Sequence, residues 1–337
     1  MKINIQEIAR RSNVSIATVS RVLNNKGPVK PETRNKILTL AKQLNYKPSP
    51  HARALSSRRT DTIGVILPEL VDEYFMDIIQ GIDEEAHLFN KYLMISSSHS
   101  QRNDIETIME FMGSGRTDGA IIMAPSLHDE IYEVIKKSKR PVVLLNCCSS
   151  KTNVVSFNID NYRGARQIVA HLIDHGYRKI GMIKGPDRNI EAQARFEGFH
   201  DILVERGLEY KENYVISGDF SLTSGNYGML RLMGSDDKPQ AIFAANDYMA
   251  IGAYQAARNL NLKIPEDVAI VGFDDIFTSR IIHPRLTTVH VPVVELGRRA
   301  LNYLVGMIDG TKDPAESYHE ELSTGLVIGE SCGCKSK

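Results

Sequence analysis

Hydrophobic residues follow two different patterns along this chain. Over the first 45 residues they recur at helical spacing, and from Thr62 onward short apolar runs typical of buried strands alternate with helical stretches. The first series of runs covers 63–67, 92–96, 119–123 and 142–145, and the second covers 179–183, 214–217, 241–245 and 268–272. The pattern predicts an all-α head followed by an α/β body of two doubly wound lobes, each built on a parallel sheet.

Helices are predicted between these strands, notably over 75–90, 162–175 and 247–260. One face of the stretch 162–175 carries, at helical spacing, Ala165, Ile168, Val169, Leu172 and Ile173. Ligands of doubly wound folds bind at the carboxyl ends of the strands. With two lobes, we therefore expect a ligand site in the cleft between them.

The first 24 residues have the pattern of a helix-turn-helix. Asn4 and Glu7 have the spacing of a capping box, which predicts a helix that begins at Ile5. Asn13 stands where the chain must turn, because Asn tolerates the left-handed conformation better than most residues. Ser15 is then predicted to cap a second helix.

The second helix has an unusual outer face. Its inward side chains are expected to be Val19, Val22 and Leu23, and those left outside are Ile16, Ala17, Ser20 and Arg21. A solvated surface helix rarely presents Ile and Ala in its first turn beside an Arg. A recognition helix in a DNA major groove does, because its first residues contact base edges. The alternative interpretation is a short two-helix packing unit.

A third helix and a short fourth one complete the head. The third is predicted over 31–44, with Ile37, Leu38, Ala41 and Leu44 against the first two helices. The proline-rich stretch 46–50 ends it, and Ser49 and Pro50 then begin a helix over 51–56. A helix this short is unstable alone in water. We expect DNA and a second copy of the chain to stabilise it.

The charge of the chain is distributed unevenly, although the net charge is zero. Residues 1–60 contain 13 Lys and Arg against Glu7 and Glu32, a net charge of +11, so the remaining residues carry −11. A basic head on an acidic body is typical of a protein whose head binds a polyanion.

Several classes of protein are excluded by what the sequence lacks. No apolar run approaches the length of a membrane span and no signal-peptide core is present, so we expect a soluble cytoplasmic chain without membrane contact. A periplasmic solute receptor would need that signal and no basic head. An enzyme would need a nucleophile–base pair, a phosphate loop or a metal cluster, and none is recognisable.

The four cysteines predict neither a metal site nor a cofactor. Cys147 and Cys148 are adjacent, which makes it difficult for both to bind one metal ion. Cys332 and Cys334 form a Cys-Gly-Cys pair that no His-rich stretch accompanies in the sequence.

From Ile5 to about Ser331 the chain carries a series of motifs that resemble those of one known protein family. In the head, the resemblance rests on Val-Ser-Ile-Ala-Thr-Val-Ser-Arg-Val-Leu-Asn at 14–24, Leu-Asn-Tyr-Lys-Pro at 44–48 and Ala-Arg-Ala-Leu at 52–55. In the body it rests on 181–183, 195–199, 218–220, 245–247, 271–275 and 284–289. These motifs resemble those of the LacI/GalR family of bacterial transcription regulators. The resemblance implies a dimeric repressor-like fold that consists of a headpiece, a hinge helix and a body similar to periplasmic sugar-binding proteins.

The resemblance also implies the domain limits. We expect a DNA-binding headpiece over 1–48, a hinge helix and linker over 49–60, and an effector-binding and dimerisation body over 61–337. The first lobe would comprise about 61–160 and 291–323, and the second about 161–290 and 324–337.

Particular residues receive roles from this resemblance. Those expected to contact a palindromic operator are Ser15, Ile16, Ala17, Thr18, Ser20, Arg21, Asn24 and Leu55, with Leu55 wedged into the minor groove. Those expected to contact the effector are Tyr74, Phe75, Arg195, Phe220, Asn246 and Asp274. Their chemistry suits a sugar or sugar phosphate, because carboxylate, guanidinium and amide groups bind hydroxyls and Phe rings cover an apolar face.

Two departures bear on the effector. Many relatives have an acidic–basic pair where this chain has Asn146-Cys147-Cys148, and the stretch 69–73 is more acidic than usual. Two further effector classes stay open. Ile16-Ala17 resembles the catabolite-control branch, whose corepressor is a phosphorylated carrier protein, and a purine-responsive repressor is the other alternative.

Overall fold

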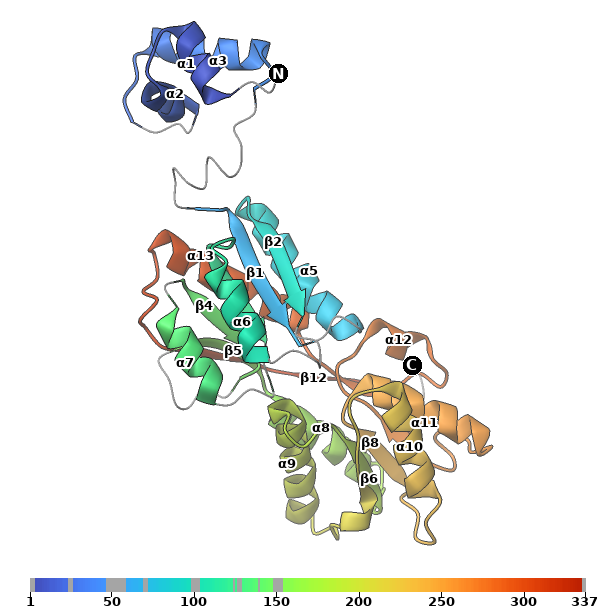
Figure 1. Cartoon of the computed structure of the whole chain (residues 1–337). Helices are drawn as coiled ribbons and strands as arrows, with labels where there is room; N and C mark the ends of the chain where they lie inside the picture. Colours follow the sequence, from blue (N-terminus) through green and yellow to red (C-terminus); the bar gives the residue numbers. More distant parts are fainter. Residues whose placement is uncertain are drawn as a thin grey trace.

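The computed structural model describes residues 4–23, 27–46, 59–68, 72–97, 104–123, 125, 129–138, 140–147 and 154–334. The described residues form a helical headpiece and a body of two α/β lobes, as the sequence predicts (Figure 1). The predicted hinge helix over 51–56 lies outside the described residues, and so do Asn24, Leu55 and Cys148. Among the described helices, none combines the length and the apolar character that a membrane span requires.

The headpiece consists of α1 (Ile5–Ser12), α2 (Ile16–Leu23) and α3 (Pro31–Gln43). The Asn4 side chain accepts a hydrogen bond from the Glu7 N–H at 3.0 Å, and Asn13 has the left-handed φ of 55° that the turn requires. Ser15 Oγ accepts from the Thr18 N–H at 3.1 Å and so caps α2. The expected caps and turn are therefore confirmed.

One prediction for the headpiece core is wrong. Ile8, Val19 and Ile37 are fully buried together, but Leu38 is 44% exposed and Leu40 packs against the core instead. Leu38 lies about 100° around the helix from Ile37, whereas Leu40 lies three residues on and shares its face.

The described residues of the first lobe form a six-stranded parallel sheet of order β11-β5-β4-β3-β1-β2. Its strands are β1 (Thr62–Leu67), β2 (Tyr92–Ser97), β3 (Gly119–Met123), β4 (Val142–Leu145), β5 (Val155–Ile159) and β11 (Tyr318–Leu322). Its helices are α5 (Glu73–Leu88), α6 (Asp104–Gly113), α7 (Asp129–Lys137) and α13 (Val293–Asp309). Gly81 lets α5 and α13 pack closely, since a Cβ there would lie 2.0 Å from the Val294 carbonyl oxygen.

In the second lobe, the part of the chain that the structure describes forms a four-stranded parallel sheet of order β7-β6-β8-β9, beside an antiparallel pair of β10 and β12. Its strands are β6 (Ile180–Lys184), β7 (Val215–Ser217), β8 (Ala241–Ala244), β9 (Ala269–Val271), β10 (Thr288–His290) and β12 (Gly325–Val327). Its helices are α8 (Asn161–Asp174), α9 (Ile190–Glu205), α10 (Leu222–Met233), α11 (Asp247–Asn259) and α12 (Phe277–Ile281), with the short 3-10 helix η1 (Glu212–Tyr214).

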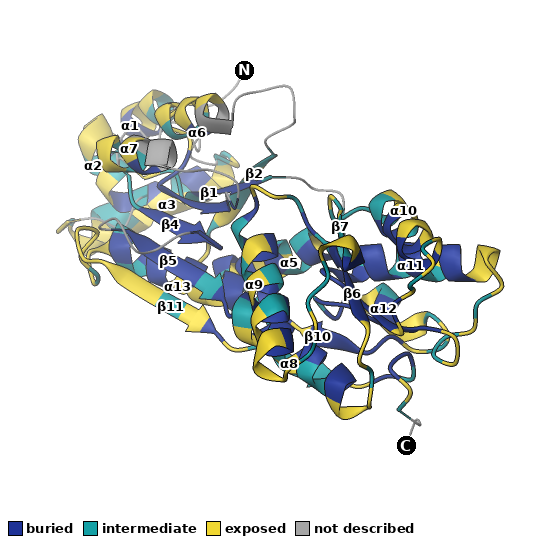
Figure 2. Ribbon diagram, turned by 90° about the horizontal axis from the view of Figure 1, so that it is seen from below, coloured by how far each residue is buried: buried dark blue, intermediate teal, exposed yellow. Residues whose placement is uncertain are grey.

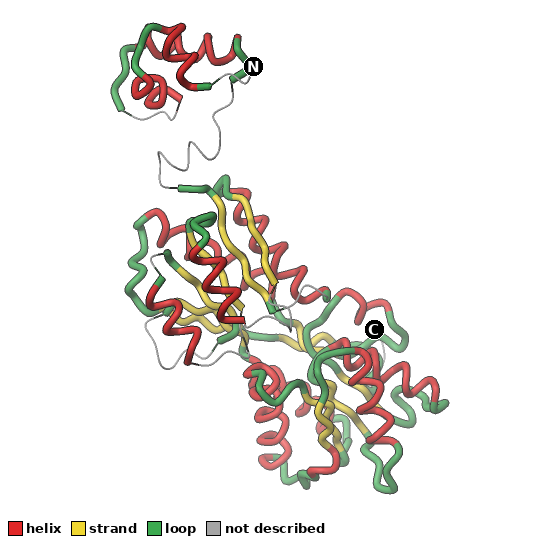
Figure 3. The backbone as a smooth tube through the Cα atoms, in the orientation of Figure 1, coloured by secondary structure: helices red, strands yellow, loops and turns green. Residues whose placement is uncertain are grey.

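The chain passes between the two lobes after β5, after β10 and after β11. In Figure 2 the strands of both sheets are mostly buried, while the helices expose their outer faces, and Figure 3 shows strands and helices alternating in each lobe. The eight strand runs expected from the sequence correspond to β1–β4 and β6–β9, with every end within one residue. The predicted apolar face of α8 is buried throughout.

Candidate functional site

The outer face of α2 carries the side chains that the sequence singles out for base contact. Ile16 is 46% exposed, and Ala17 and Arg21 are also exposed. Ser15 and Thr18 form the cap of the helix, with their hydroxyl oxygens 2.9 Å apart, and Ser20 is half-buried. The helix therefore presents an apolar first turn and a cation one turn later, which are the groups that match a thymine methyl and a guanine edge.

A cavity of about 500 Å³ lies between the two lobes. All six side chains expected to contact an effector line it: Tyr74, Phe75, Arg195, Phe220, Asn246 and Asp274. Tyr74 and Phe75 come from the start of α5 in the first lobe, whereas the other four come from the second lobe. The fold thus brings together residues that are up to 200 positions apart in the sequence.

Arg195 lies at the centre of the buried polar groups beside this cavity. Its side chain is 3% exposed, and its Nη2 atom lies 3.1 Å from Asp274 Oδ1. Its Nε donates to Asn161 Oδ1 at 2.7 Å and its Nη1 to the Ala245 carbonyl oxygen at 2.5 Å. The guanidinium plane also stacks on the Phe273 ring, 3.9 Å from its centroid. Arg195 is consequently held in one orientation.

Asp274 occupies a conformation that few non-glycine residues adopt. Its φ is 114°, and its Oδ1 is buried without a hydrogen-bond partner among the described residues, even though Arg195 Nη2 is within ion-pair distance. Phe220, across the cavity lining, also has a positive φ of 68°. Strained backbone of this kind gathers at ligand sites, and a buried acceptor without a donor is a place where a ligand hydroxyl gains a hydrogen bond.

Asn246 has a positioning role that the sequence analysis does not assign. Its Oδ1 caps α11 by accepting from the Met249 N–H at 2.9 Å, and its Nδ2 donates to the Phe220 carbonyl oxygen at 3.1 Å. One polar group of the side chain thereby caps α11, and the other holds the loop that carries Phe220.

Glu191 is a residue that the sequence analysis misses. It lies one turn before Arg195 on α9, is buried, and accepts hydrogen bonds from Tyr74 Oη at 3.2 Å and Asn146 Nδ2 at 2.9 Å. Asn146 Nδ2 also lies 3.0 Å from Tyr74 Oη. Because Glu191 belongs to the second lobe and the other two to the first, this cluster joins the lobes. The i, i+4 spacing to Arg195 is the sequence signal that points to it.

Two further contacts cross between the lobes. Glu73, at the start of α5, accepts from both the backbone N–H and the hydroxyl group of Thr278, at the start of α12. The Ile190 N–H donates to the Pro125 carbonyl oxygen at 3.1 Å. These hydrogen bonds fix the separation of the lobes around the cavity.

Burial perturbs the acidic groups of the site. Burial raises the pKa of Asp274 well above its usual range, against the opposing effect of the Arg195 guanidinium. The pKa of Glu191 is raised for the same reason, and Arg195 again opposes the shift. Burial and the nearby Glu191 carboxylate raise the pKa of Tyr74. Both carboxyl groups therefore hold their protons to a higher pH than a surface carboxyl group.

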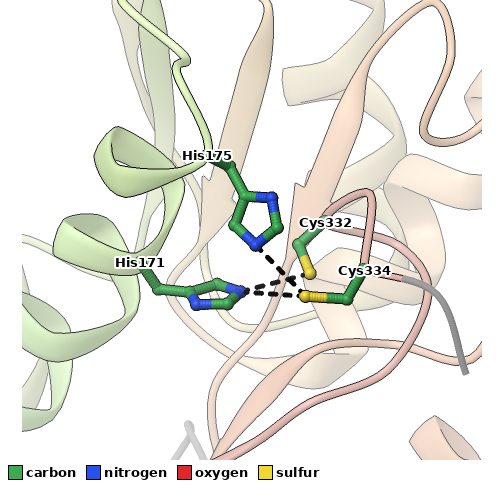
Figure 4. Close-up of side chains that lie close together, drawn as sticks. All are labelled: His171, His175, Cys332 and Cys334. Atoms are coloured by element: carbon green, nitrogen blue, oxygen red, sulfur yellow. Dashed lines mark hydrogen bonds between the residues drawn. The ribbon is translucent and has the colours of Figure 1, made fainter. Parts of the chain in front are cut away.

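The fold gives the C-terminal cysteines neighbours that the sequence does not show. The Cys332-Gly-Cys334 segment does have histidine neighbours, because α8 brings His171 and His175 to it (Figure 4). Cys147 follows β4, is buried, and lies outside that cluster.

A helix-turn-helix joined to a two-lobed body with an interlobe cavity is the architecture of a ligand-regulated DNA-binding protein. The family model "Bacterial regulatory proteins, lacI family" matches residues 4–49, and "Periplasmic binding protein-like domain" matches residues 169–332. The chain is 35% identical over 306 residues to catabolite control protein A of Priestia megaterium, covering 90% of this chain and 92% of that protein.

Solved structures agree over the whole length. A lac repressor dimer bound to operator and the anti-inducer ONPF matches with a TM-score of 0.88 and 26% identity, covering 98% of this chain and 99% of that one. A complex of the transcriptional regulator CelR with cellobiose matches with a TM-score of 0.75 and 28% identity, at the same coverage. The chain belongs to the lacI family of bacterial regulatory proteins, and it is a DNA-binding transcriptional regulator, not an enzyme.

Proposed function

We propose that this chain is a homodimeric cytoplasmic repressor whose affinity for a palindromic operator is set by a small polyhydroxylated effector. The observation that carries the proposal is the interlobe cavity, in which Asp274 offers a buried, unbonded oxygen beside Arg195 and the half-buried rings of Phe75 and Phe220. A sugar has both kinds of surface, since its hydroxyl groups donate hydrogen bonds and its ring carbons form an apolar face.

Charge favours a neutral sugar over a sugar phosphate. The residues that line the cavity include four carboxyl groups, those of Asp72, Glu191, Asp219 and Asp274. Among the described lining residues, the basic side chain is that of Arg195. Arg195 is already paired with Asp274 and hydrogen-bonded to the protein on two sides. A phosphate placed there would meet uncompensated negative charge, so a neutral mono- or disaccharide is the better match. The relative that is complexed with cellobiose supports this class.

The DNA contacts of the proposal come from α2 and the hinge. Ile16 and Ala17 would contact thymine methyl groups, Arg21 would donate to a guanine, and Ser15, Thr18, Ser20 and Asn24 would contact the same site. Leu55 from each subunit would enter the minor groove at the operator centre. A relative bound to its operator as a dimer supports the arrangement.

Coupling between the two sites would pass through the lobes. An effector that contacts Phe75 in one lobe and Asp274 in the other would change the relative orientation of the lobes. The hinge connects the headpiece to the first lobe, so this change would be passed to the DNA-binding helices. Such coupling is typically about 1–3 kcal/mol and is reciprocal, so operator must change effector affinity by the same factor.

A catabolite-control role is the second candidate. It is favoured by the 35% identity to catabolite control protein A and by Ile16-Ala17 in the recognition helix. In that case a phosphorylated carrier protein would act as corepressor, whether or not a sugar binds.

The test is a thermal-shift and calorimetry screen of the full chain against neutral sugars, sugar phosphates and purines, followed by operator titrations with and without the hit. A ligand that binds the folded state raises its melting temperature by mass action. Asp274→Ala should abolish the response of operator binding to the ligand while leaving operator affinity without ligand intact. The exposed Asp236→Asn is the matched control.

The outcomes separate the candidates. A neutral sugar that binds the wild type and the control but not Asp274→Ala supports the proposal. A hit confined to phosphates or purines, or an Asp274→Ala variant with the wild-type response, contradicts it. Operator affinity that responds only to a phosphorylated carrier protein supports the second candidate.

A further inference from the structure

Four metal-ligating side chains from two distant parts of the chain converge beside α8. His171 Nε2 lies 3.2 Å from Cys332 Sγ and 3.8 Å from Cys334 Sγ, and His175 Nε2 lies 3.1 Å from Cys334 Sγ. All four ligand atoms lie within 4.8 Å of one another. Figure 4 shows the two imidazole rings and the two sulfur atoms directed toward a common point. This group is separate from the interlobe cavity, because none of its members lines that cavity.

Local structure explains why both pairs face the same point. His171 and His175 are one turn apart at the end of α8, so they share a face of the helix. Gly333 has a φ of 95°, and this left-handed turn lets the chain direct both neighbouring sulfur atoms toward the helix. The pairs belong to segments about 160 residues apart, and the interface between those segments brings their nitrogen and sulfur atoms together.

The distances suit a tetrahedral zinc ion. With Zn–N near 2.0 Å and Zn–S near 2.3 Å, neighbouring ligand atoms of a tetrahedral site lie about 3.3–3.8 Å apart. The three N···S distances, 3.1 to 3.8 Å, fall on or just below this range. The widest separation, 4.8 Å at most, exceeds the longest distance of an ideal site by about 1 Å.

The surroundings of the group resemble a supporting shell. The Thr287 hydroxyl donates to Cys332 Sγ at 3.1 Å, and its oxygen accepts from the Gly329 N–H at 2.9 Å. Tyr177 Oη donates to the Cys332 carbonyl oxygen at 3.2 Å. Cys332 is fully buried, whereas His175 is exposed, so an ion can enter from the surface and end in a partly buried position. Donors to a ligating sulfur and a fixed backbone are the features that orient metal ligands.

We propose that His171, His175, Cys332 and Cys334 form a structural zinc site. Two thiolates and two imidazoles complete a tetrahedral coordination shell with no open position, which is the arrangement of structural rather than catalytic zinc. The ion would fasten the C-terminal segment to the end of α8. Asn161, at the start of the same helix, accepts a hydrogen bond from Arg195. Next to the cysteines, the Ser331 carbonyl oxygen accepts a hydrogen bond from the Ile270 N–H of β9. The site therefore braces the lobe that carries most of the effector cavity.

The test is elemental analysis of the reduced full-length protein. The wild type is expected to contain about one zinc per chain, and His175→Ala and Cys334→Ala at least about tenfold less. His200→Ala removes a half-buried histidine and Cys147→Ala removes a buried thiol, both outside the group, so these controls should keep the wild-type content. Replacement of zinc by Co²⁺ in the wild type should produce the visible bands of a tetrahedral site and a thiolate charge-transfer band.

A second measurement guards against variants that fail to fold. Circular dichroism shows whether each variant is folded, and chelation of the wild type should lower its melting temperature without any substitution. Wild-type protein without zinc and with no Co²⁺ spectrum would overturn the proposal. So would equal zinc in the variants, loss of zinc in the controls as well, or a Cys332–Cys334 disulfide in protein purified under reducing conditions.

Discussion

Asn146 Nδ2 in the first lobe lies 2.9 Å from Glu191 Oε1 in the second, and both side chains are buried. Tyr74 Oη donates to the same carboxylate oxygen at 3.2 Å. Hydrogen-bond donors from the opposite lobe stabilise this buried carboxyl group, and Arg195 Nη2 lies 3.9 Å away in its own lobe. The contact between the lobes is consequently polar, and it can be altered without changing either hydrophobic core.

Removing the amide donor should weaken this contact. Asn146→Ala leaves Glu191 with one donor fewer, and the free energy of unfolding is expected to fall by about 1–3 kcal/mol in urea titrations. Asn302→Ala, which removes an exposed amide bonded to Glu85, should stay within about 0.5 kcal/mol of the wild type. Equal stability of the two variants would show that the contact between the lobes contributes little.

Arg21 should determine part of the operator sequence. Arg21→Ala is expected to cost about 1–3 kcal/mol of operator affinity and to relax discrimination at one base position. Affinity of the wild type should fall steeply with rising salt, because basic groups of the headpiece displace counterions from phosphates. Titrations of operators mutated at single positions measure both effects, with the exposed Arg231→Ala in the second lobe as control. A uniform loss on every sequence would indicate a phosphate contact instead.

Leu55 should contribute mainly to the affinity for operator DNA. Unstacking a base step costs a few kcal/mol, which is offset by the contacts that the bend permits. Leu55→Ala is therefore expected to lower affinity for operator far more than affinity for random DNA in paired titrations. Leu38→Ala, which shortens an exposed leucine of α3, should change neither. Equal losses on both DNAs would contradict a wedge at the operator centre.

The contribution of Asp247 to the free energy of unfolding should decrease as the pH rises toward neutrality. Burial raises the pKa of Asp247 from 3.8 to about 7 in the folded chain, so between these values the folded state holds a proton that the unfolded state has released. The contribution is fully present below pH 3.8 and is lost as the pH passes through about 7. Urea titrations over this range should show the decline, and Asp247→Asn should reduce its slope. An Asp247→Asn variant with the same slope as the wild type would contradict the assignment.

The Asn4 cap should stabilise α1 locally. Asn4→Ala removes the acceptor for the Glu7 N–H and is expected to cost about 1 kcal/mol, whereas Asn4→Ser retains a cap. Hydrogen exchange of the α1 amides in the full chain measures this as a loss of protection of roughly fivefold for Asn4→Ala only. Unchanged protection in both variants would mean that packing alone holds the helix.

The sequence by itself determined the features that depend on near neighbours. The caps at Asn4 and Ser15, the turn at Asn13 and the strand β3 follow from interactions within a few residues, so they are readable in one dimension. The Leu38 error shows the limit of this reading, because two faces of a helix about 100° apart can both contain leucine and only packing chooses between them.

Only the tertiary structure decided which distant side chains meet. Glu191 faces Asn146 because two lobes close on each other, and His171 reaches Cys332 because the C-terminal segment returns to α8. Neither pair leaves a local pattern in the sequence, since hydrogen bonds and metal ligation depend on separation in space and not along the chain. Periodicity specifies elements, whereas the site arises from how those elements pack.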